Sequence, residues 1–168
     1  LLELLRRGDI RSVIVFTRTK HRANRLADYL TRHGVNAGRI HGNRSQAQRT
    51  EALARFKNRR IRVLVATDIA ARGIDIDGLS HVLNFDVPGS PEDYVHRIGR
   101  TARAEALGDA LTLVAPDEES ELGAIERALR LRPDREHVLG VDRLRQDARR
   151  HVGDAGDREA AKTHVAGR

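Results

Sequence analysis

Short apolar runs alternate along the chain with longer segments in which apolar residues recur at helical spacing. The runs at residues 12–16, 62–66 and 81–85 are rich in Val, Ile and Leu, which is typical of strands buried on both faces of a parallel sheet. A weaker run at 37–41 and a last one at 110–114 complete the set of expected strands. These five strands predict one sheet at the centre of the domain.

The segments between the runs predict helices over residues 20–33, 46–57 and 117–130, with a further helix that starts after Ser90. Strands that alternate with helices are connected by crossovers, so we expect an α/β domain with a mostly parallel sheet and helices on both of its faces. Ligands of such domains lie beyond the carboxyl ends of the strands. The loops that follow the strands are therefore the places to look for function.

Capping residues support these helices. Thr19 and Gly34 are suited to begin and end the first helix, and Ser45 with Gln48 forms a capping box for the second. Ser90 precedes Pro and two acids, which is a strong helix start.

The hydrophobic content falls after about residue 131, so we expect a domain over residues 1–131 and a basic, flexible extension over 132–168. Within the extension, residues 137–150 predict a weak helix, and 151–168 are expected to be disordered. The extension carries nine Lys or Arg and seven Asp or Glu, a net charge of +2, so most of the basic excess belongs to the domain.

Composition narrows the function classes. Charged residues make up 33% of the 168 residues and the hydrophobic class 39%, which is ordinary for a globular protein. No apolar stretch is long enough to span a bilayer, and there is no cysteine, so we expect no membrane partner, no thiolate metal site and a cytoplasmic location. The chain opens without Met and reads as a fragment of a longer protein.

The formal net charge of +7 and pI of about 10.8 suit a polyanionic partner, although basic proteins without one are common. Aromatic residues make up only 3%, so any RNA binding should use the backbone rather than stacked bases.

The strongest chemical signal is H-R-I-G-R-T-A-R at residues 96–103, in which four of eight residues are basic. Helical spacing gathers His96, Arg97, Arg100 and Arg103 on one side, which is unfavourable unless an anion relieves the repulsion. Guanidinium groups match phosphate oxygens, and an arginine finger accelerates phosphoryl transfer strongly. The alternative is a solvated basic helix face.

A second segment, V-A-T-D-I-A-A-R-G-I-D-I at residues 65–76, follows a buried strand. Thr67 is suited either to bind a phosphate or to cap the next turn. Gly73 offers a positive φ or close approach of the backbone. Asp75, between two isoleucines, needs a partner, which a ribose hydroxyl or an arginine would supply.

Two further segments follow strands. In I-H-G-N-R-S-Q-A-Q-R at residues 40–49, Gln46 and Arg49 share a face of the first helical turn, where phosphate binds readily, and Gly42 allows close approach. An ordinary capped helix is the alternative. In V-I-V-F-T-R-T-K at residues 13–20, Thr19 is one of several hydroxyl and basic residues at a strand end.

Taken in order, these four strings resemble motifs IV, IVa, V and VI of DEAD-box RNA helicases over residues 1–130, and within that family they suggest the bacterial RhlE-like branch. The resemblance implies a RecA-like, three-layer α/β/α domain. This is the second of two such domains in an ATP-dependent helicase that remodels RNA duplexes or ribonucleoproteins. The first domain carries the phosphate-binding loop and the D-E-A-D acids that hold Mg²⁺, and neither string occurs in this chain. The chain alone should not hydrolyse ATP.

The same resemblance implies roles for individual residues. Arg100 and Arg103 would be arginine fingers, with His96 as a further catalytic residue. Gly73 and Asp75 would complete the ATP site at the ribose, and no metal ligand is implied. His96 and Arg97 would contact the first domain. The residues implied to bind the RNA backbone are Thr19, Gly42, Gln46, Arg49 and Thr67. Ala102 and the stretch around Glu105 depart from the usual family spelling, which makes a role for that loop doubtful.

Three other functions remain open at this level. The chain would be an RNA-binding module without coupling to ATP if its RNA affinity ignored the first domain. It would be a DNA translocase of the wider superfamily if DNA stimulated it better than RNA. The extension would be an interaction arm if it bound a partner.

Overall fold

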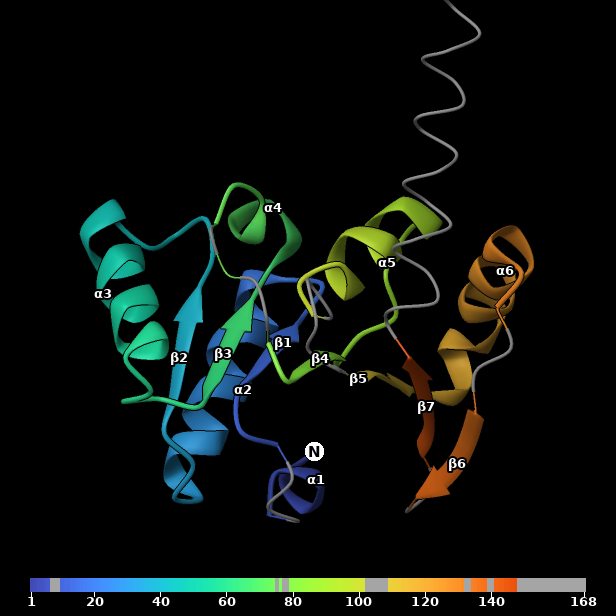
Figure 1. Ribbon diagram of the computed structural model, residues 1–168, viewed down its shortest axis with the longest axis horizontal. Coiled ribbons are helices and arrows are strands. Elements are labelled where there is room, and N and C mark those ends of the chain that lie inside the picture. Colours follow the sequence, from blue (N-terminus) through green and yellow to red (C-terminus); the bar gives the residue numbers. More distant parts are fainter. Residues whose placement is uncertain are drawn as a thin grey trace, which may run out of the picture.

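The computed structural model describes most of the chain (Figure 1). The described residues are 1–6, 10–74, 76, 79–101, 109–131, 134–138 and 141–147. Asp75, Ala102, Arg103 and Glu105 lie outside them, and so does the expected disorder over 151–168.

The centre of the fold is one sheet of seven strands in the order β2-β3-β1-β4-β5-β7-β6. The first five pair in parallel, as the sequence predicts. They are β1 (Val13–Phe16), β2 (Ala37–Ile40), β3 (Val63–Ala66), β4 (His81–Asn84) and β5 (Asp109–Val114). Strands β1, β3 and β4 are buried along their whole length, which explains their apolar composition.

Helices cover both faces of this sheet. On one face α1 (Leu2–Arg6) and α2 (Lys20–Arg32) pack through Leu5, Leu26 and Leu30 against a layer that includes Val13 and Val63. The opposite face is covered by α3 (Gln46–Lys57), the short α4 (Asp68–Ala71), α5 (Pro91–Ile98) and α6 (Glu119–Leu129). A 3₁₀ turn, η1 (Pro116–Glu118), precedes α6. The three-layer α/β/α architecture is therefore confirmed (Figure 1).

The predicted caps are present. The Thr19 hydroxyl accepts a hydrogen bond from the Arg22 N–H at the start of α2. Ser45 and Gln48 form both bonds of the capping box of α3, and the Ser90 hydroxyl accepts from the Asp93 N–H with Pro91 in the first turn. These local signals set where each helix begins, and so where each preceding loop leaves the sheet.

The chain after α6 differs from the prediction. The weak helix expected over 137–150 is wrong, because β7 (Val141–Asp147) occupies that range and pairs antiparallel with β5. It is joined to β6 (Asp134–Val138) in an antiparallel pair, so a hairpin inside the expected flexible extension continues the sheet. The edge of β5 offers unpaired backbone groups to such a strand, and this tertiary pairing is invisible to local helix propensity. The leading helix α1 was also not predicted.

No helix within the described part of the chain is both long and apolar enough to cross a bilayer.

Candidate functional site

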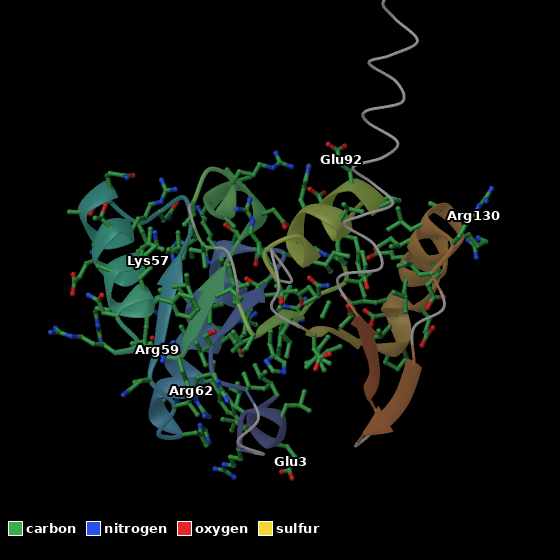
Figure 2. All side chains as sticks on the ribbon, viewed as in Figure 1. Glu3, Lys57, Arg59, Arg62, Glu92 and Arg130 are labelled. Carbon is green, nitrogen blue, oxygen red and sulfur yellow. The ribbon has the colours of Figure 1, made fainter. Side chains whose placement is uncertain are left out.

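The basic segment begins on α5 and continues past its end. Ser90 caps the helix, and the first-turn acid Glu92 points away from the domain (Figure 2), whereas Asp93 accepts a hydrogen bond of 3.0 Å from Arg72. The helix lies between α4 and α6 on one face of the sheet (Figure 1). Tyr94 and Ile98 anchor the helix in the core, so His96 and Arg97 project from a fixed helix, and Arg100 follows two residues after its end.

Arg97 is a buried cation with its partners inside the domain. Its side chain is only 3% exposed, and it makes a two-pronged pair with Asp68 through Nε (2.6 Å) and Nη2 (2.8 Å). Nη1 donates to Asn84 Oδ1 at 3.2 Å and to the Asp86 carbonyl at 2.9 Å. The guanidinium also lies 5.1 Å from the centre of the Phe16 ring. A buried charge is tolerated when it is paired and hydrogen-bonded, and here it is both.

This burial differs from the contact with a neighbouring domain expected for Arg97. Very little of the guanidinium is exposed, because Asp68, Asn84 and Phe16 surround it. Its observed contacts join the ends of β1 and β4 to α4 and α5. Of the two residues expected to reach another domain, His96 alone is exposed.

Two of Arg97's partners escaped the sequence analysis. Asp68 begins α4, and its position directly after a buried strand was a usable signal. Asn84 is fully buried in β4, where its amide donates to Thr112 Oγ1 on β5 at 3.1 Å. A polar residue within an apolar strand must find partners, but the pattern alone does not say which.

Arg100 is placed differently from Arg97. Its guanidinium is partly exposed and donates from Nη1 to the Ile74 carbonyl at 3.0 Å, and no described carboxylate lies within ion-pair distance of it. It lines a shallow depression together with residues of β1, of α4 and its C-cap, and of α5, which are Phe16, Asp68, Ala71, Arg72, Asp93, His96 and Arg97. A cation so placed is free to meet an anion from outside the described residues.

Gly73 immediately precedes Ile74, whose carbonyl accepts the hydrogen bond from Arg100. Its φ of +74° is in the region that favours glycine, and a side chain there would meet open space. Gly73 is therefore required by the backbone conformation, as predicted. Its expected neighbour Asp75 and the expected finger Arg103 lie outside the described residues.

The residues expected to bind RNA gather at the carboxyl ends of three adjacent strands. Thr19 follows β1, Gly42 and Gln46 follow β2, and Thr67 follows β3. Two contacts connect these loops: Lys20 Nζ donates to Asn43 Oδ1 at 3.1 Å, and the Thr67 N–H donates to the Ile40 carbonyl at 3.2 Å. Thr19, Gly42 and Gln46 are exposed, and the Thr67 hydroxyl makes no capping bond to α4.

Arg49 is the member of this group whose side chain turns inward. Its Nη1 donates to Gln46 Oε1 and its Nη2 to the Ala70 carbonyl of α4, each at 3.2 Å. Its Nε is buried and has no hydrogen-bond partner among the described residues.

His41 directly follows β2 and lies buried below the loops that carry the residues proposed to bind RNA. Its Nε2 lies 2.9 Å from Asn24 Oδ1, and the Asn43 N–H donates to its Nδ1, which fixes the proton on Nε2. Burial lowers the pKa of His41, and the nearby cations Arg44, Arg39 and Lys20 lower it further. The imidazole is thus held neutral between two asparagines.

The fold and site define the chain as a parallel α/β/α domain in which Asp68 neutralises Arg97, whereas Arg100 is partly exposed and pairs with no described carboxylate. The chain belongs to the helicase conserved C-terminal domain family, whose match covers residues 1–105.

Relatives and solved structures agree with this membership. The chain is 53% identical over 135 residues to the DEAD-box ATP-dependent RNA helicase CshA of Bacillus subtilis, a match that covers 79% of this chain and 27% of that protein. The chain therefore spans little more than a quarter of this curated relative. The RhlE-like branch stays a prediction, since this relative carries another name.

The fold is similar to that of the E. coli DEAD-box protein SrmB, with a TM-score of 0.73 and 45% identity over 76% of this chain and 75% of that one. It is also similar to the C-terminal domain of the DEAD-box protein Dbp5, with a TM-score of 0.69 and 35% identity over 75% of this chain and 74% of that one. The RecA-like class of the domain is confirmed.

Proposed function

We propose that the chain is the second motor domain of a DEAD-box RNA helicase. It couples ATP hydrolysis to local unwinding of RNA or remodelling of ribonucleoproteins, together with an N-terminal RecA-like domain. The observation that carries this proposal is the contrast between two arginines of one segment. Asp68 neutralises Arg97 inside the domain, whereas Arg100 is partly exposed and pairs with no described carboxylate.

The described residues fit a triphosphate that approaches from outside the domain. Arg100 donates through Nη1 to a backbone carbonyl, which orients the guanidinium, and this is its one side-chain hydrogen bond within the described residues. Guanidinium donors are well matched to phosphate oxygens. Gly73 is exposed, and nothing stands within 4 Å of a side chain built there, so a nucleotide can pass close to the backbone. Asp75 at the ribose, with Arg103 as a second finger, completes the proposed site.

ATP supplies the phosphoanhydride bond that is hydrolysed, and the chain's own part is electrostatic. Arg100 and Arg103 stabilise the negative charge that develops on the transferred phosphoryl group. His96, whose side chain is exposed, contacts the N-terminal domain. That domain is also where we place the acids that hold Mg²⁺. Because the fingers act only on a nucleotide held by the other domain, closure of the two domains switches the reaction on.

We assign RNA binding to Thr19, Gly42, Gln46 and Thr67, which share one edge of the sheet. Hydroxyls, a backbone without a side chain and an amide are suited to phosphate and sugar, which carry no sequence information. The proposed protein therefore grips RNA of any sequence. We place it in the cytoplasm.

The test is Arg100→Ala in a protein that carries both motor domains. An arginine finger is worth about 10³–10⁵ in turnover, so RNA-stimulated ATP hydrolysis should fall by orders of magnitude. Arg25→Ala removes the same charge from the exposed side of α2 and should leave turnover near wild type. Turnover of the Arg100→Ala protein within about threefold of wild type would show that the finger assignment is wrong, on the scale just given. Comparing stimulation by RNA and by DNA separates the proposal from a DNA translocase.

A further inference from the structure

The short helix α4 lies between the residues proposed for RNA and those proposed for ATP. It has four residues, and isolated helices of that length are unstable because the cost of forming the first turn is not recovered. Thr67 immediately precedes it, and Gly73 and Ile74 follow it closely. The position of α4 therefore determines the position of the Thr67 hydroxyl and that of the Ile74 carbonyl, which orients Arg100.

Two arginines from other helices hold α4 from opposite ends. Arg97 of α5 binds the carboxylate of Asp68, the first residue of α4. Arg49 of α3 donates to the carbonyl of Ala70, in the last turn. The last carbonyls of a helix lack partners within it, and a cationic donor there satisfies both the hydrogen bond and the helix dipole.

The geometry of Arg49 is that of a clamp. Nη2 is committed to α4 and Nη1 to Gln46, and Nε is buried. In place of the RNA contact that its motif implies, we propose that Arg49 is a positioning residue. It fixes α4 against α3. The residues proposed to bind RNA, at the carboxyl ends of β1, β2 and β3, are then held in a fixed position relative to Arg100. This inference rests on the proposed function for its consequence in turnover, although the clamp itself does not.

The test compares Arg49→Met with Arg55→Met in the protein that carries both motor domains. Arg55 is exposed in the last turn of the same helix, so its variant removes the same charge away from α4. We expect RNA-stimulated kcat to fall at least tenfold for Arg49→Met and to stay near wild type for Arg55→Met. Half-saturation by RNA should change little in either variant.

The salt dependence of RNA affinity separates a clamp from a phosphate contact. Each lost phosphate contact to single-stranded RNA makes the slope of log affinity against log salt shallower by about 0.7. A clamp leaves the slope of the Arg49→Met protein equal to that of the Arg55→Met control. A slope that is shallower than the control by about 0.7, with kcat retained, would overturn the proposal.

Hydrogen exchange gives a readout that needs no activity. The amides of Ala70, Ala71 and Arg72 close α4 onto Thr67 and Asp68, so loss of the clamp should speed their exchange at least tenfold over the control. Unchanged exchange at these amides overturns the inference even if the helicase proposal stands. Wild-type protein without RNA-stimulated turnover, in contrast, overturns the proposed function while the exchange result still decides the clamp.

If Arg49→Met fails to fold, Arg49→Lys, which keeps one donor for Ala70, is measured in the same three ways. Its kcat and amide exchange should then change in the same direction but less, and wild-type values of both overturn the inference.

Discussion

Asp68 holds Arg97 with two hydrogen bonds of 2.6 and 2.8 Å, and this pair joins the helix after β3 to the helix after β4. The arginine side is 3% exposed and the aspartate side 27%. The arginine of the pair is therefore shielded from water, whereas the aspartate is partly exposed to it.

Asp68→Asn should destabilise the domain by about 3 kcal/mol, because removing one partner leaves a buried charge uncompensated. The value lies at the lower end of the range for such pairs, since Asp68 itself is partly exposed. Urea unfolding measures the free energy directly. The comparison variant is Arg72→Met, which breaks an ion pair whose arginine side chain is 62% exposed and should cost less than about 1 kcal/mol. Equal losses for the two variants would contradict the distinction drawn between them.

Two glycines should respond oppositely to the same substitution. Gly73 has a φ of +74°, so Gly73→Ala should cost about 1 kcal/mol or more of unfolding free energy. Gly42 has no positive φ and open space around it, so Gly42→Ala should be within about 0.5 kcal/mol of wild type or slightly stabilising. Thermal unfolding of both variants provides the comparison. In the protein with both motor domains, Gly42→Ala should nevertheless weaken RNA binding, because the new methyl group would stand where the proposed RNA contact needs the phosphate close to the backbone.

The neutral His41 makes the domain sensitive to mild acid. Burial lowers its pKa in the folded state, so between its ordinary value of 6.5 and that lowered value the unfolded chain binds the extra proton more readily. Stability contributed by neutral His41 is therefore complete above about pH 6.5 and declines as the pH falls below it. Unfolding free energies at pH 7.5 and pH 5 should differ less in His41→Gln than in wild type. A pH dependence that the substitution leaves intact assigns the effect to other groups.

Truncation after Leu131 tests the pairing of β5 with β7. The hairpin covers one edge of β5 from Asp109 to Val114. Without it, those β5 amides that face β7 lose their partners and should exchange rapidly, whereas amides that face β4 remain protected. Hydrogen exchange of the full chain and the truncated chain, read residue by residue, makes the comparison. Identical protection along β5 in both would show that the hairpin does not pair there in solution.

The parallel strands and capped helices could be predicted because their signals are local. The run at residues 63–66 is apolar throughout, and Ser45 with Gln48 marks a helix start without help from the rest of the fold. The hairpin could not be predicted, because its strands are specified by the open edge of β5 and not by their own residues. The alternation of polar residues over 141–147 fits either structure.

The candidate site divides in the same way. The motif spelling located Arg97, Arg100, Thr67 and Gly42, and the topology brings the strand ends together as parallel pairing requires. Which arginine turns inward depends on Asp68 and Asn84, which are 29 and 13 residues away in sequence from Arg97. Spacing along one helix carries no information on such distant partners.

The enclosure of Arg97 also changes how the segment should be dissected. A block substitution that removes every arginine from residues 97–103 would disrupt the helix contacts of Arg97 at the same time as it removed the two cations proposed to act on ATP. Loss of turnover in such a protein could then result either from a destabilised domain or from the loss of the proposed catalytic arginines. Only changes made one guanidinium at a time, with the internal one left in place, separate the two.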